Sequence, residues 1–408
     1  MNRPVVIVHP FSSGTELAPA FKKEGVPAIA ISVKPIERIG YGTKIQVNDF
    51  IEVIPEQENL VEILRKYNPL AVIAGSDSGV LLAESLSESL TPQFANDPQK
   101  SLHRVHKAFM QEALKEAGVP SLATINTASE IEVENWIKEN DLVNSSLIVK
   151  PPLSAGSYNV FHIPIKGDWK GHFRKILSEV STITGKQSET VLVQEEAIGP
   201  EFAIGTVSAN GKHYLSHIIK YNKASLHGRK TIFDHVEFSP YLEDVHGELI
   251  HYTNKVLDAL GIHWGAAHNE VILTNKGPRL IETGARMCGG PVVHFSREAT
   301  GCSQADRLVE IYTKGDVLTK DYSFKKTVVP IFLRSLQHGR VSNVEALSEI
   351  SKLPTLFREF IWFKNGDTLA QTVDYITSIG IVALSGEREA IFSDYKKIRE
   401  MEKKLIIE

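Results

Sequence analysis

The first hundred residues alternate short apolar runs, rich in β-branched residues, with amphipathic segments of helical period. The apolar runs lie at residues 4–10, 26–33 and 69–76, and the helical patterns at 14–25 and 59–68. Strands that alternate with helices in this way are typical of a parallel sheet joined by crossover helices. We therefore expect an N-terminal parallel α/β domain.

The pattern changes near residue 98. Residues 91–101 are rich in proline, asparagine and aspartate, which is typical of a domain boundary. An amphipathic helix follows and ends at Gly118 and Pro120. From about residue 147 short strands with hairpin signals replace the helices, and the end of the chain mixes both. We expect an α/β and α+β multidomain protein with three parts, residues 1–98, 99–315 and 316–408.

Composition and charge exclude several classes of protein. The 408 residues suit two or three domains. Lysine and arginine number 45 against 49 acidic residues, and no segment is strongly basic, so we expect no nucleic-acid partner. No apolar run approaches the roughly 20 residues of a membrane helix, and the N-terminus turns polar too early for a signal peptide. Two cysteines form no disulfide framework, and we expect a cytoplasmic protein without membrane association.

Candidate chemistry is concentrated in the hairpin pattern of residues 268–286, "HNEVILTNKGPRLIETGAR". A three-residue loop centred on Lys276 would bring Glu270 opposite Glu282, on one face of an antiparallel pair. Two carboxylates so close repel each other unless a cation lies between them, and Mg²⁺ favours carboxylates combined with substrate phosphates. The register therefore predicts a magnesium–phosphate site, whereas a solvated hairpin with two surface glutamates is the ordinary alternative.

Two lysines and one strand end add to this pattern. Lys150 closes an apolar strand before a Gly/Ser loop, where a lysine and loop N–H groups can hold a phosphate. Lys107 lies on the amphipathic helix, and residues 191–202, "VLVQEEAIGPEF", form an apolar strand that turns polar. Taken alone, each has a structural explanation, such as a lysine that extends to solvent.

Their order along the chain, from about residue 100 to 300, resembles the ATP-grasp superfamily. The "GARMCGGP" ending (284–291) and the overall length resemble the L-amino-acid ligases, which join free amino acids into dipeptides. The resemblance implies an ATP-grasp core over 99–315, with a mobile lid subdomain at about 140–205, and a C-terminal α+β region.

The resemblance also implies roles for individual residues. The phosphates of ATP would be held by Lys107, Lys150 and the covering loop of Ser154, Ala155, Gly156 and Ser157. The adenine edge would meet Gln194, Glu195 and Ala197, and the ribose would meet Glu201. Glu270 and Glu282 would bind one or two Mg²⁺ ions, for which Mn²⁺ can substitute. The superfamily's usual E-x-N-x-R reads E-T-G-A-R here, so Gly284 replaces an amide that often binds the second ion.

The implied reaction transfers the γ-phosphoryl group of ATP to a carboxylate, and an amine then attacks the acyl phosphate. Arg286 would act as the catalytic cation, because fixed positive charge where negative charge develops is usually the largest catalytic contribution. Gly289 and Gly290 would let backbone N–H groups approach the same oxygens.

Several further residues have two interpretations each. His268 shares a strand face with Glu270, and its side chain either contacts the substrate or only packs against its neighbours. Arg334 holds a substrate carboxylate or lies on the surface. Asp374 favours a basic, arginine-like carboxyl donor or caps a helix. Cys288 has no paired base for a nucleophilic role, and His263 with His268 lacks a third zinc ligand.

Two loops of the N-terminal domain follow apolar strands. The turn at 9–14, "HPFSSG", fits neither phosphate-loop motif, so we expect a turn capped by Ser12 or Ser13. Residues 75–80, "GSDSGV", follow a strand and are a substrate-side candidate.

Together these features predict an ATP- and Mg²⁺-dependent dipeptide ligase whose partners are ATP and free amino acids. Two alternatives stay open: a ligase acting on another biosynthetic acid or amine, and a non-catalytic ATP-binding protein. A homodimer also stays open.

Overall fold

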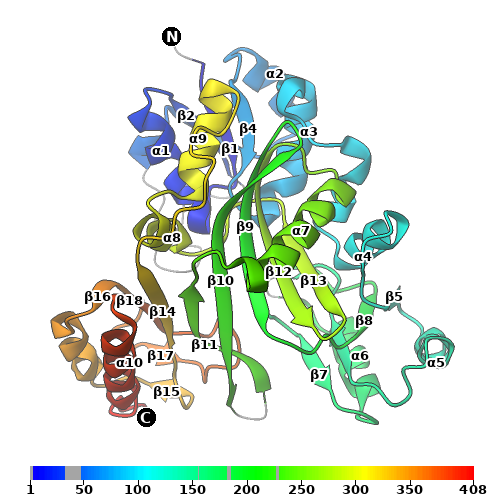
Figure 1. The fold of residues 1–408 in the computed structure, drawn as a ribbon, viewed down its shortest axis with the longest axis vertical. Coiled ribbons are helices and arrows are strands. Elements are labelled where there is room, and N and C mark those ends of the chain that lie inside the picture. Colours follow the sequence, from blue (N-terminus) through cyan, green and yellow to red (C-terminus); the bar gives the residue numbers. More distant parts are fainter. Residues whose placement is uncertain (1–2, 33–46, 155, 182–184, 227–228) are drawn as a thin grey trace.

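The computed structural model describes residues 3–32, 47–154, 156–181, 185–226 and 229–408. In Figure 1 the N-terminal elements lie at one end of the long axis, and the elements of residues 124–195 and those of the C-terminal region lie on opposite sides of the other end. The multidomain α/β and α+β class is confirmed. In the described residues, no helix combines the length and the apolar character that crossing a bilayer requires.

The N-terminal part is a parallel sheet in the order β3-β2-β1-β4, as expected. Its strands are β1 (Val5–Val8), β2 (Ala28–Ser32), β3 (Glu52–Pro55) and β4 (Ala71–Ala74). Its helices are α1 (Leu17–Lys23), α2 (Leu60–Arg65) and α3 (Val80–Leu90). The short 3-10 helices here are η1 (Ser12–Glu16), η2 (Val47–Asp49), η3 (Asp77–Gly79) and η4 (Pro92–Phe94). The sequence pattern did not indicate β3.

A smaller antiparallel sheet corresponds to the expected lid, in the order β5-β8-β6-β7. It consists of β5 (Thr124–Thr127), β6 (Leu147–Lys150), β7 (Phe161–Ile163) and β8 (Val191–Glu195). Helices α5 (Glu130–Glu139) and α6 (Trp169–Ser178) pack against it through buried Val133, Phe173 and Ile176. This sheet therefore begins earlier in the chain than residue 140.

The largest sheet is antiparallel, in the order β13-β12-β9-β10-β11-β14-β18-β16. Its central strands are β9 (Glu201–Ala209), β10 (Lys212–Leu226), β11 (Arg229–Phe238), β12 (Gly265–Thr274) and β13 (Gly277–Gly284). The C-terminal region adds β14 (Thr327–Leu333), β16 (Leu356–Ile361) and β18 (Gly380–Gly386). Among the described residues the two halves join at one paired position, His235 with Ile331.

The remaining elements cover the large sheet or complete its ends. The amphipathic pattern after residue 98 divides into η5 (Pro98–Arg104) and α4 (Lys107–Glu116), since buried Arg104 turns toward Glu84 and the carbonyl of Leu260. The other helices are α7 (Glu243–Ala259), α8 (Val292–Thr300), α9 (Gln304–Lys314), η6 (Val344–Lys352) and α10 (Arg388–Glu402). Strands β15 (Gly339–Arg340) and β17 (Thr368–Leu369) pair with each other.

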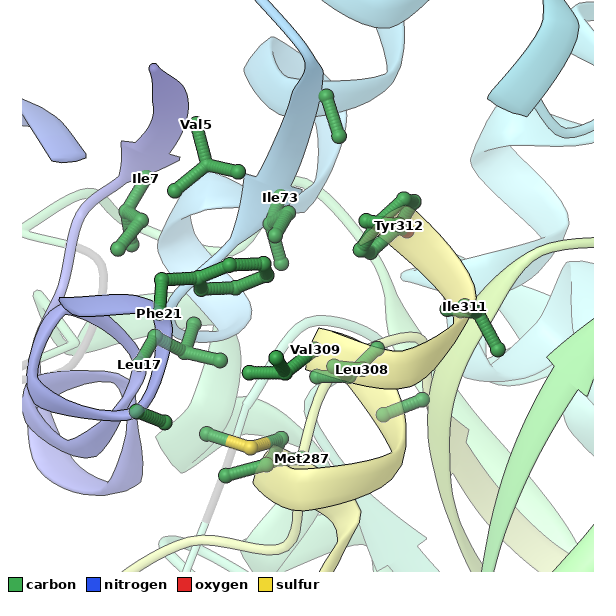
Figure 2. Packing of buried hydrophobic residues seen from close by; sticks show 14 of the residues in the cluster. Val5, Ile7, Leu17, Phe21, Ile73, Met287, Leu308, Val309, Ile311 and Tyr312 are labelled. Atoms are coloured by element: carbon green, nitrogen blue, oxygen red, sulfur yellow. The ribbon is translucent and has the colours of Figure 1, made fainter. Parts of the chain in front are cut away.

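One hydrophobic core joins the N-terminal sheet to the middle of the chain. Helix α9 packs its buried Leu308 and Tyr312 against the cluster that contains Ile7 and Phe21 (Figure 2). Met287 is buried in the same cluster, directly after Arg286. Burial of these side chains therefore fixes the loop that carries Arg286 relative to the N-terminal domain.

Candidate active site

A cavity of about 330 Å³ opens where the three parts of the chain meet. It is lined by most of the residues predicted above: Lys107, Lys150, Ser154, Gly156, Ser157, Gln194, Glu195, Ala197, Glu201, His268, Glu270, Glu282, Arg286 and Gly289. Ala155 lies outside the described residues. Among the described residues, Arg334 and Asp374 are the two predicted site residues that do not line the cavity.

The predicted pairing of Glu270 with Glu282 is confirmed, although the turn differs from the expected one. Thr274 pairs with Gly277, so the loop has two residues, Asn275 and Lys276. The shorter loop alone would shift the pairing by one residue. A register shift offsets this, because Val271 pairs with Leu280 while Glu270 pairs with Glu282, which leaves Ile281 unpaired. A β-bulge at Ile281 therefore brings both carboxylates to the cavity.

Cationic and hydrogen-bonding groups surround the two carboxylates. The Nζ atom of Lys107 lies 2.9 Å from Oε2 of Glu282, and Tyr221 donates its hydroxyl to Oε1 of Glu270 at 3.2 Å. Burial alone would raise the pKa of Glu270, but His268 and nearby lysines hold it at about 2. Two carboxylates on one face are a donor set that fits Mg²⁺, which prefers oxygen ligands.

His268 contacts Glu270, with its Nε2 atom 3.3 Å from Oε1. Burial disfavours the imidazolium form, but neighbouring Cys288 and Glu270 raise the pKa of His268 to about 10. The side chain lines the cavity as well as packing in it.

The two predicted phosphate lysines come from different elements. Lys150 ends β6 and Lys107 begins α4, and both are buried. Burial and the nearby charge of Lys107 lower the pKa of Lys150 to about 8, against the opposing effect of the glutamates. An anion in this cavity would therefore stabilise the charged form of Lys150.

The loop after β6 is held between α4 and the C-terminal region. Lys107 donates its backbone N–H to the carbonyl of Pro152 at 3.1 Å and its Nζ to the carbonyl of Ser154. Gly156 has a φ of +64°, and a Cβ at this position would lie 3.1 Å from Ile376. Ser154, Gly156 and Ser157 thus line the cavity between α4 and the C-terminal region.

The predicted adenine and ribose residues line one end of the cavity. Gln194 donates Nε2 to Thr124 Oγ1 at 2.9 Å, and Glu195 Oε1 accepts the backbone N–H of Ala123 at 2.8 Å. These side chains are therefore already bound within the lid. Glu201 pairs with Lys223 at 2.6 Å, and burial raises its pKa despite that lysine.

Arg286 contacts the carboxylate of Asp77, which the sequence indicates only as part of the substrate-side candidate at residues 75–80. Its Nη2 atom lies 2.7 Å from Oδ2 of Asp77, in the N-terminal domain. Burial of Arg286 would lower its pKa, but Asp77 raises it, so the guanidinium stays charged. Asp77 Oδ1 also lies 3.2 Å from where a Cβ of Gly284 would stand. A carboxylate oxygen thus lies close to the position that an amide side chain usually occupies.

The turn at Ser12 differs from the expected cap. The η1 helix has no side-chain cap hydrogen bond, and Ser12 Oγ instead accepts the backbone N–H of Gly290 at 2.7 Å. The N–H of Gly290 is therefore bound by Ser12 rather than directed at a substrate oxygen. Ser12, Gly289 and Gly290 all line the cavity.

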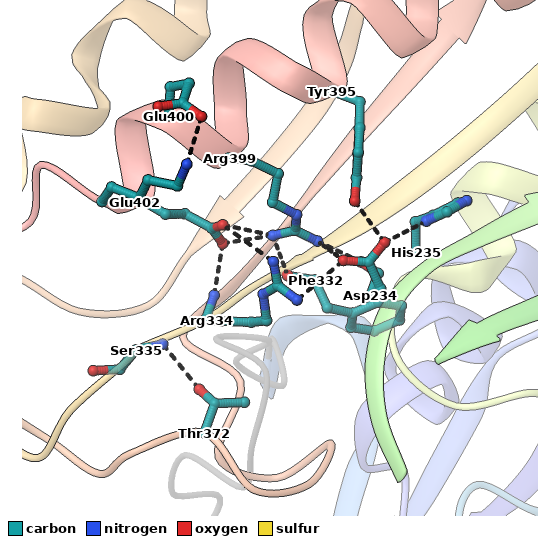
Figure 3. Close-up of polar contacts among 11 residues, drawn as sticks. Asp234, His235, Phe332, Arg334, Ser335, Thr372, Tyr395, Arg399, Glu400 and Glu402 are labelled. Atoms are coloured by element: carbon teal, nitrogen blue, oxygen red, sulfur yellow. Dashed lines mark hydrogen bonds and ion pairs between the residues drawn. The ribbon is translucent and has the colours of Figure 1, made fainter. Parts of the chain in front are cut away.

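Arg334, predicted to hold a substrate carboxylate or to lie on the surface, does not line the cavity. Its Nη1 atom lies 3.1 Å from Oδ1 of Asp234, and its backbone N–H donates to Glu402 at 2.8 Å (Figure 3). Arg399 of α10 binds the same two carboxylates. Arg334 thus belongs to an ion network that joins α10 to β11 and β14, because a cation at a strand end can face either side of the sheet.

Asp374, predicted as a substrate residue or a cap, also lies outside the cavity lining. Oδ1 of Asp374 accepts the backbone N–H of Thr377 at 2.9 Å and its hydroxyl at 2.8 Å. This local cap is the kind of bond that an aspartate before a turn commonly makes. The neighbouring Tyr375 lines the cavity instead.

An apolar wall completes the cavity and was not predicted. It consists of Ile219, Phe233, Val236, Phe332 and Tyr375, which come from β10, β11, β14 and the segment before β18. Phe233 and Tyr375 lie edge to face, with ring centroids 5.7 Å apart. No local sequence signal marks these residues, since the sheet brings them together from distant parts of the chain.

Comparisons with known proteins agree with this arrangement. A family model described as an ATP-grasp domain matches residues 143–294. The chain is 26% identical to dapdiamide A synthase of Enterobacter agglomerans, over 98% of this chain and 95% of that protein. It is 22% identical to an L-arginine-specific L-amino acid ligase of Bacillus subtilis, over 79% of this chain and 76% of that protein.

Among solved structures, the crystal structure of an L-amino acid ligase from Bacillus licheniformis is similar along the whole chain. The TM-score is 0.78 at 18% sequence identity, and the match covers 100% of this chain and 98% of that one.

Proposed function

The chain is an ATP-grasp protein and an ATP-dependent carboxylate–amine ligase, and on that premise we propose that it joins two free L-amino acids into a dipeptide, with release of ADP and phosphate. The observation that carries this proposal is the pairing of Glu270 with Glu282 beside Lys107, Lys150 and Arg286 in one cavity.

In the proposed first step, a carboxylate oxygen of one amino acid attacks the γ-phosphorus of ATP, and the bond to the β–γ bridging oxygen breaks. Lys107 and Lys150 hold the phosphate oxygens, and Arg286 stabilises charge on the transferring group. Glu270 and Glu282 would hold one or two Mg²⁺ ions, which supply positive charge beside the phosphates.

In the second step, the amino group of the other amino acid attacks the acyl carbon, phosphate leaves with the bonding pair, and the amine loses a proton. Water must be kept out because it would hydrolyse the acyl phosphate. The loop of Ser154, Gly156 and Ser157 is suited to this, since it crosses the cavity and contacts the C-terminal region at Ile376.

The apolar wall supports a specific substrate class. We propose that the side chain of one amino acid packs against Phe233, Phe332 and Tyr375, and that this side chain is apolar or aromatic. The arginine-like preference expected from Asp374 is not part of the proposal, because Thr377 occupies that carboxylate. The relative that is specific for L-arginine is only 22% identical to this chain, so the residues of its substrate pocket need not be the same.

We also propose that residues 1–98, 99–315 and 316–408 act as three units around the cavity. Each contributes lining residues: Asp77 from the first, the nucleotide residues from the second, and Phe332 from the third. Helix α9 belongs to the second range but packs on the N-terminal sheet, so the first two units are expected to move together.

A screen for phosphate release with ATP, Mg²⁺ and the twenty amino acids, singly and in pairs, tests the function. We expect release only with amino acids present, and mass spectrometry should detect a dipeptide. ADP formation that needs no amino acid would contradict the dipeptide proposal.

The second candidate is the same chemistry on another biosynthetic acid or amine. The observation that favours it is the match of nearly the full chain to dapdiamide A synthase. Phosphate release that requires one amino acid together with a non-amino-acid carboxylate would support this candidate. A non-catalytic ATP-binding protein would instead bind ATP without any phosphate release.

A further inference from the structure

Two histidines flank a glycine in the middle of the large sheet. His217 on β10 pairs with Gly205 on β9, and His268 on β12 pairs with the same glycine from the other side. Directly opposed residues on antiparallel strands share a face of the sheet. A Cβ at Gly205 would lie 2.2 Å from the ring of His217. The glycine therefore provides the space in which the imidazole of His217 lies, beside His268.

Cys288 completes a cluster with these two histidines. One ligand atom each of His217, His268 and Cys288 lies within 4.8 Å of the others. The three residues are buried, with relative exposures of 1%, 6% and 6%. Both ring nitrogens of His217 lack a hydrogen-bond partner within the described parts of the chain, whereas His268 contacts Cys288 and Glu270. Buried polar atoms in folded proteins almost always have a partner, so the two nitrogens of His217 point to a missing ligand.

The orientation of His268 points to a metal ion as that ligand. Its Nε2 atom lies 3.3 Å from Oε1 of Glu270, which leaves Nδ1 as the nitrogen available to the cluster. Histidines that bind metals usually donate their other ring N–H to a carboxylate, which orients the ring and increases its basicity. Glu270 is in the position of that carboxylate.

We propose that His217, His268 and Cys288 form a binding site for Zn²⁺. Imidazole nitrogens and a thiolate are the ligands that zinc prefers, whereas Mg²⁺ prefers the oxygens of Glu270 and Glu282. The two ions would therefore occupy neighbouring but chemically distinct positions. Three protein ligands leave a fourth position open. Because His268 and Cys288 line the cavity, that position faces the proposed active site.

Cobalt provides a direct spectroscopic test of this site. Metal-free protein would be saturated with Mg²⁺ and titrated with Co²⁺, which takes up zinc sites and gives a thiolate-to-cobalt absorption band. We expect the band in the wild-type protein, its loss on addition of Zn²⁺, and its absence in Cys288→Ser. Cys302→Ser is the matched control, because Cys302 is the only other cysteine and is also buried.

Zinc binding should also change the thermal stability, because a ligand that binds only the folded state raises the unfolding midpoint. We expect Zn²⁺ to raise the midpoint of the wild type and of Cys302→Ser, but not of Cys288→Ser or His217→Gln. The zinc affinity of His217→Gln should fall by more than about 100-fold, since even outer-shell partners typically account for about 10- to 100-fold.

Two results would overturn the proposal. One is a wild-type protein that gives no thiolate-to-cobalt band and no zinc-dependent stabilisation. The other is a Cys288→Ser protein that retains both. If His217→Gln fails to fold, Cys288→Ser still decides the question, because it exchanges a single sulfur for oxygen. Neither readout measures catalysis, so the test does not depend on the proposed ligase reaction.

Discussion

Replacement of Arg286 by alanine separates catalysis from nucleotide binding. The guanidinium contacts Asp77 and follows β13, the strand that carries Glu282, whereas the proposed adenine residues lie on β8 and just after it. Loss of one group that stabilises developing charge typically costs about 10²–10³ in turnover, or roughly 2.7–4 kcal/mol. We therefore expect Arg286→Ala to reduce kcat by that factor while the Kd for ATP changes little.

The effect on folding should be small. Asp77 loses its partner in Arg286→Ala, but its side chain is 50% exposed, so water can solvate the carboxylate. Pairs with an exposed member typically contribute about 1 kcal/mol or less to the free energy of unfolding. Asp77→Asn is the matched control, because it breaks the same ion pair but retains the guanidinium.

Phosphate release under saturating substrates measures kcat, and calorimetry with ATP measures Kd. Asp77→Asn should lose less turnover than Arg286→Ala. Near-normal turnover in Arg286→Ala would remove Arg286 from the mechanism. Equal losses in the two variants would show that the ion pair, rather than the positive charge, is what the reaction requires.

Four further outcomes are expected. Glu282→Gln should require a higher Mg²⁺ concentration for half-maximal phosphate release, because an amide replaces the carboxylate that faces Glu270; an unchanged Mg²⁺ requirement would contradict this role. The pKa of Lys150 is lowered to about 8 by burial and Lys107, so its ammonium is present below that pH and lost above it. The affinity for ATP should therefore fall as pH rises through about 8, and Lys150→Arg, measured by calorimetry on either side of that value, should not show this fall. Asp234→Asn should lower the free energy of unfolding in urea by about 3–5 kcal/mol, because Arg334 and Arg399 lose their shared carboxylate; a change within error would refute the importance of the network. Phe332→Ala should raise the KM for an apolar amino acid and leave the KM for ATP unchanged, whereas equal changes in both would contradict the proposed pocket.

The parts of the site that follow from local sequence were predictable. Glu270 and Glu282 lie on two strands joined by a short turn, so alternation of side chains along a hairpin limits where they can point. The length of the turn was not predictable, because the sequence pattern does not distinguish a three-residue loop from a two-residue loop followed by a bulge at Ile281. The parallel N-terminal sheet was predictable because β1, β2 and β4 are separate apolar runs, whereas β3, with its mostly exposed residues, was not.

Contacts between distant segments could not be predicted from one sequence. Asp77 meets Arg286 only because α9 and Met287 pack on the N-terminal sheet. The zinc-type cluster was overlooked because His263 is near His268 in sequence, whereas His217 and Cys288 are near it only in the folded sheet. Arg334 and Asp374 were misplaced because local sequence does not specify which face of an element a side chain occupies.

Among the described residues, β11 and β14 pair at one position, His235 with Ile331, and this narrow connection has an evolutionary consequence. The apolar wall depends partly on Phe332 and Tyr375, which lie beyond this joint, whereas the carboxylates and lysines lie before it. Exchange of the last quarter of the gene between related proteins would thus alter which building blocks are accepted and leave the nucleotide chemistry intact. On the proposed function, recombination of this kind would change the substrates of the ligase without a change in its ATP-dependent step.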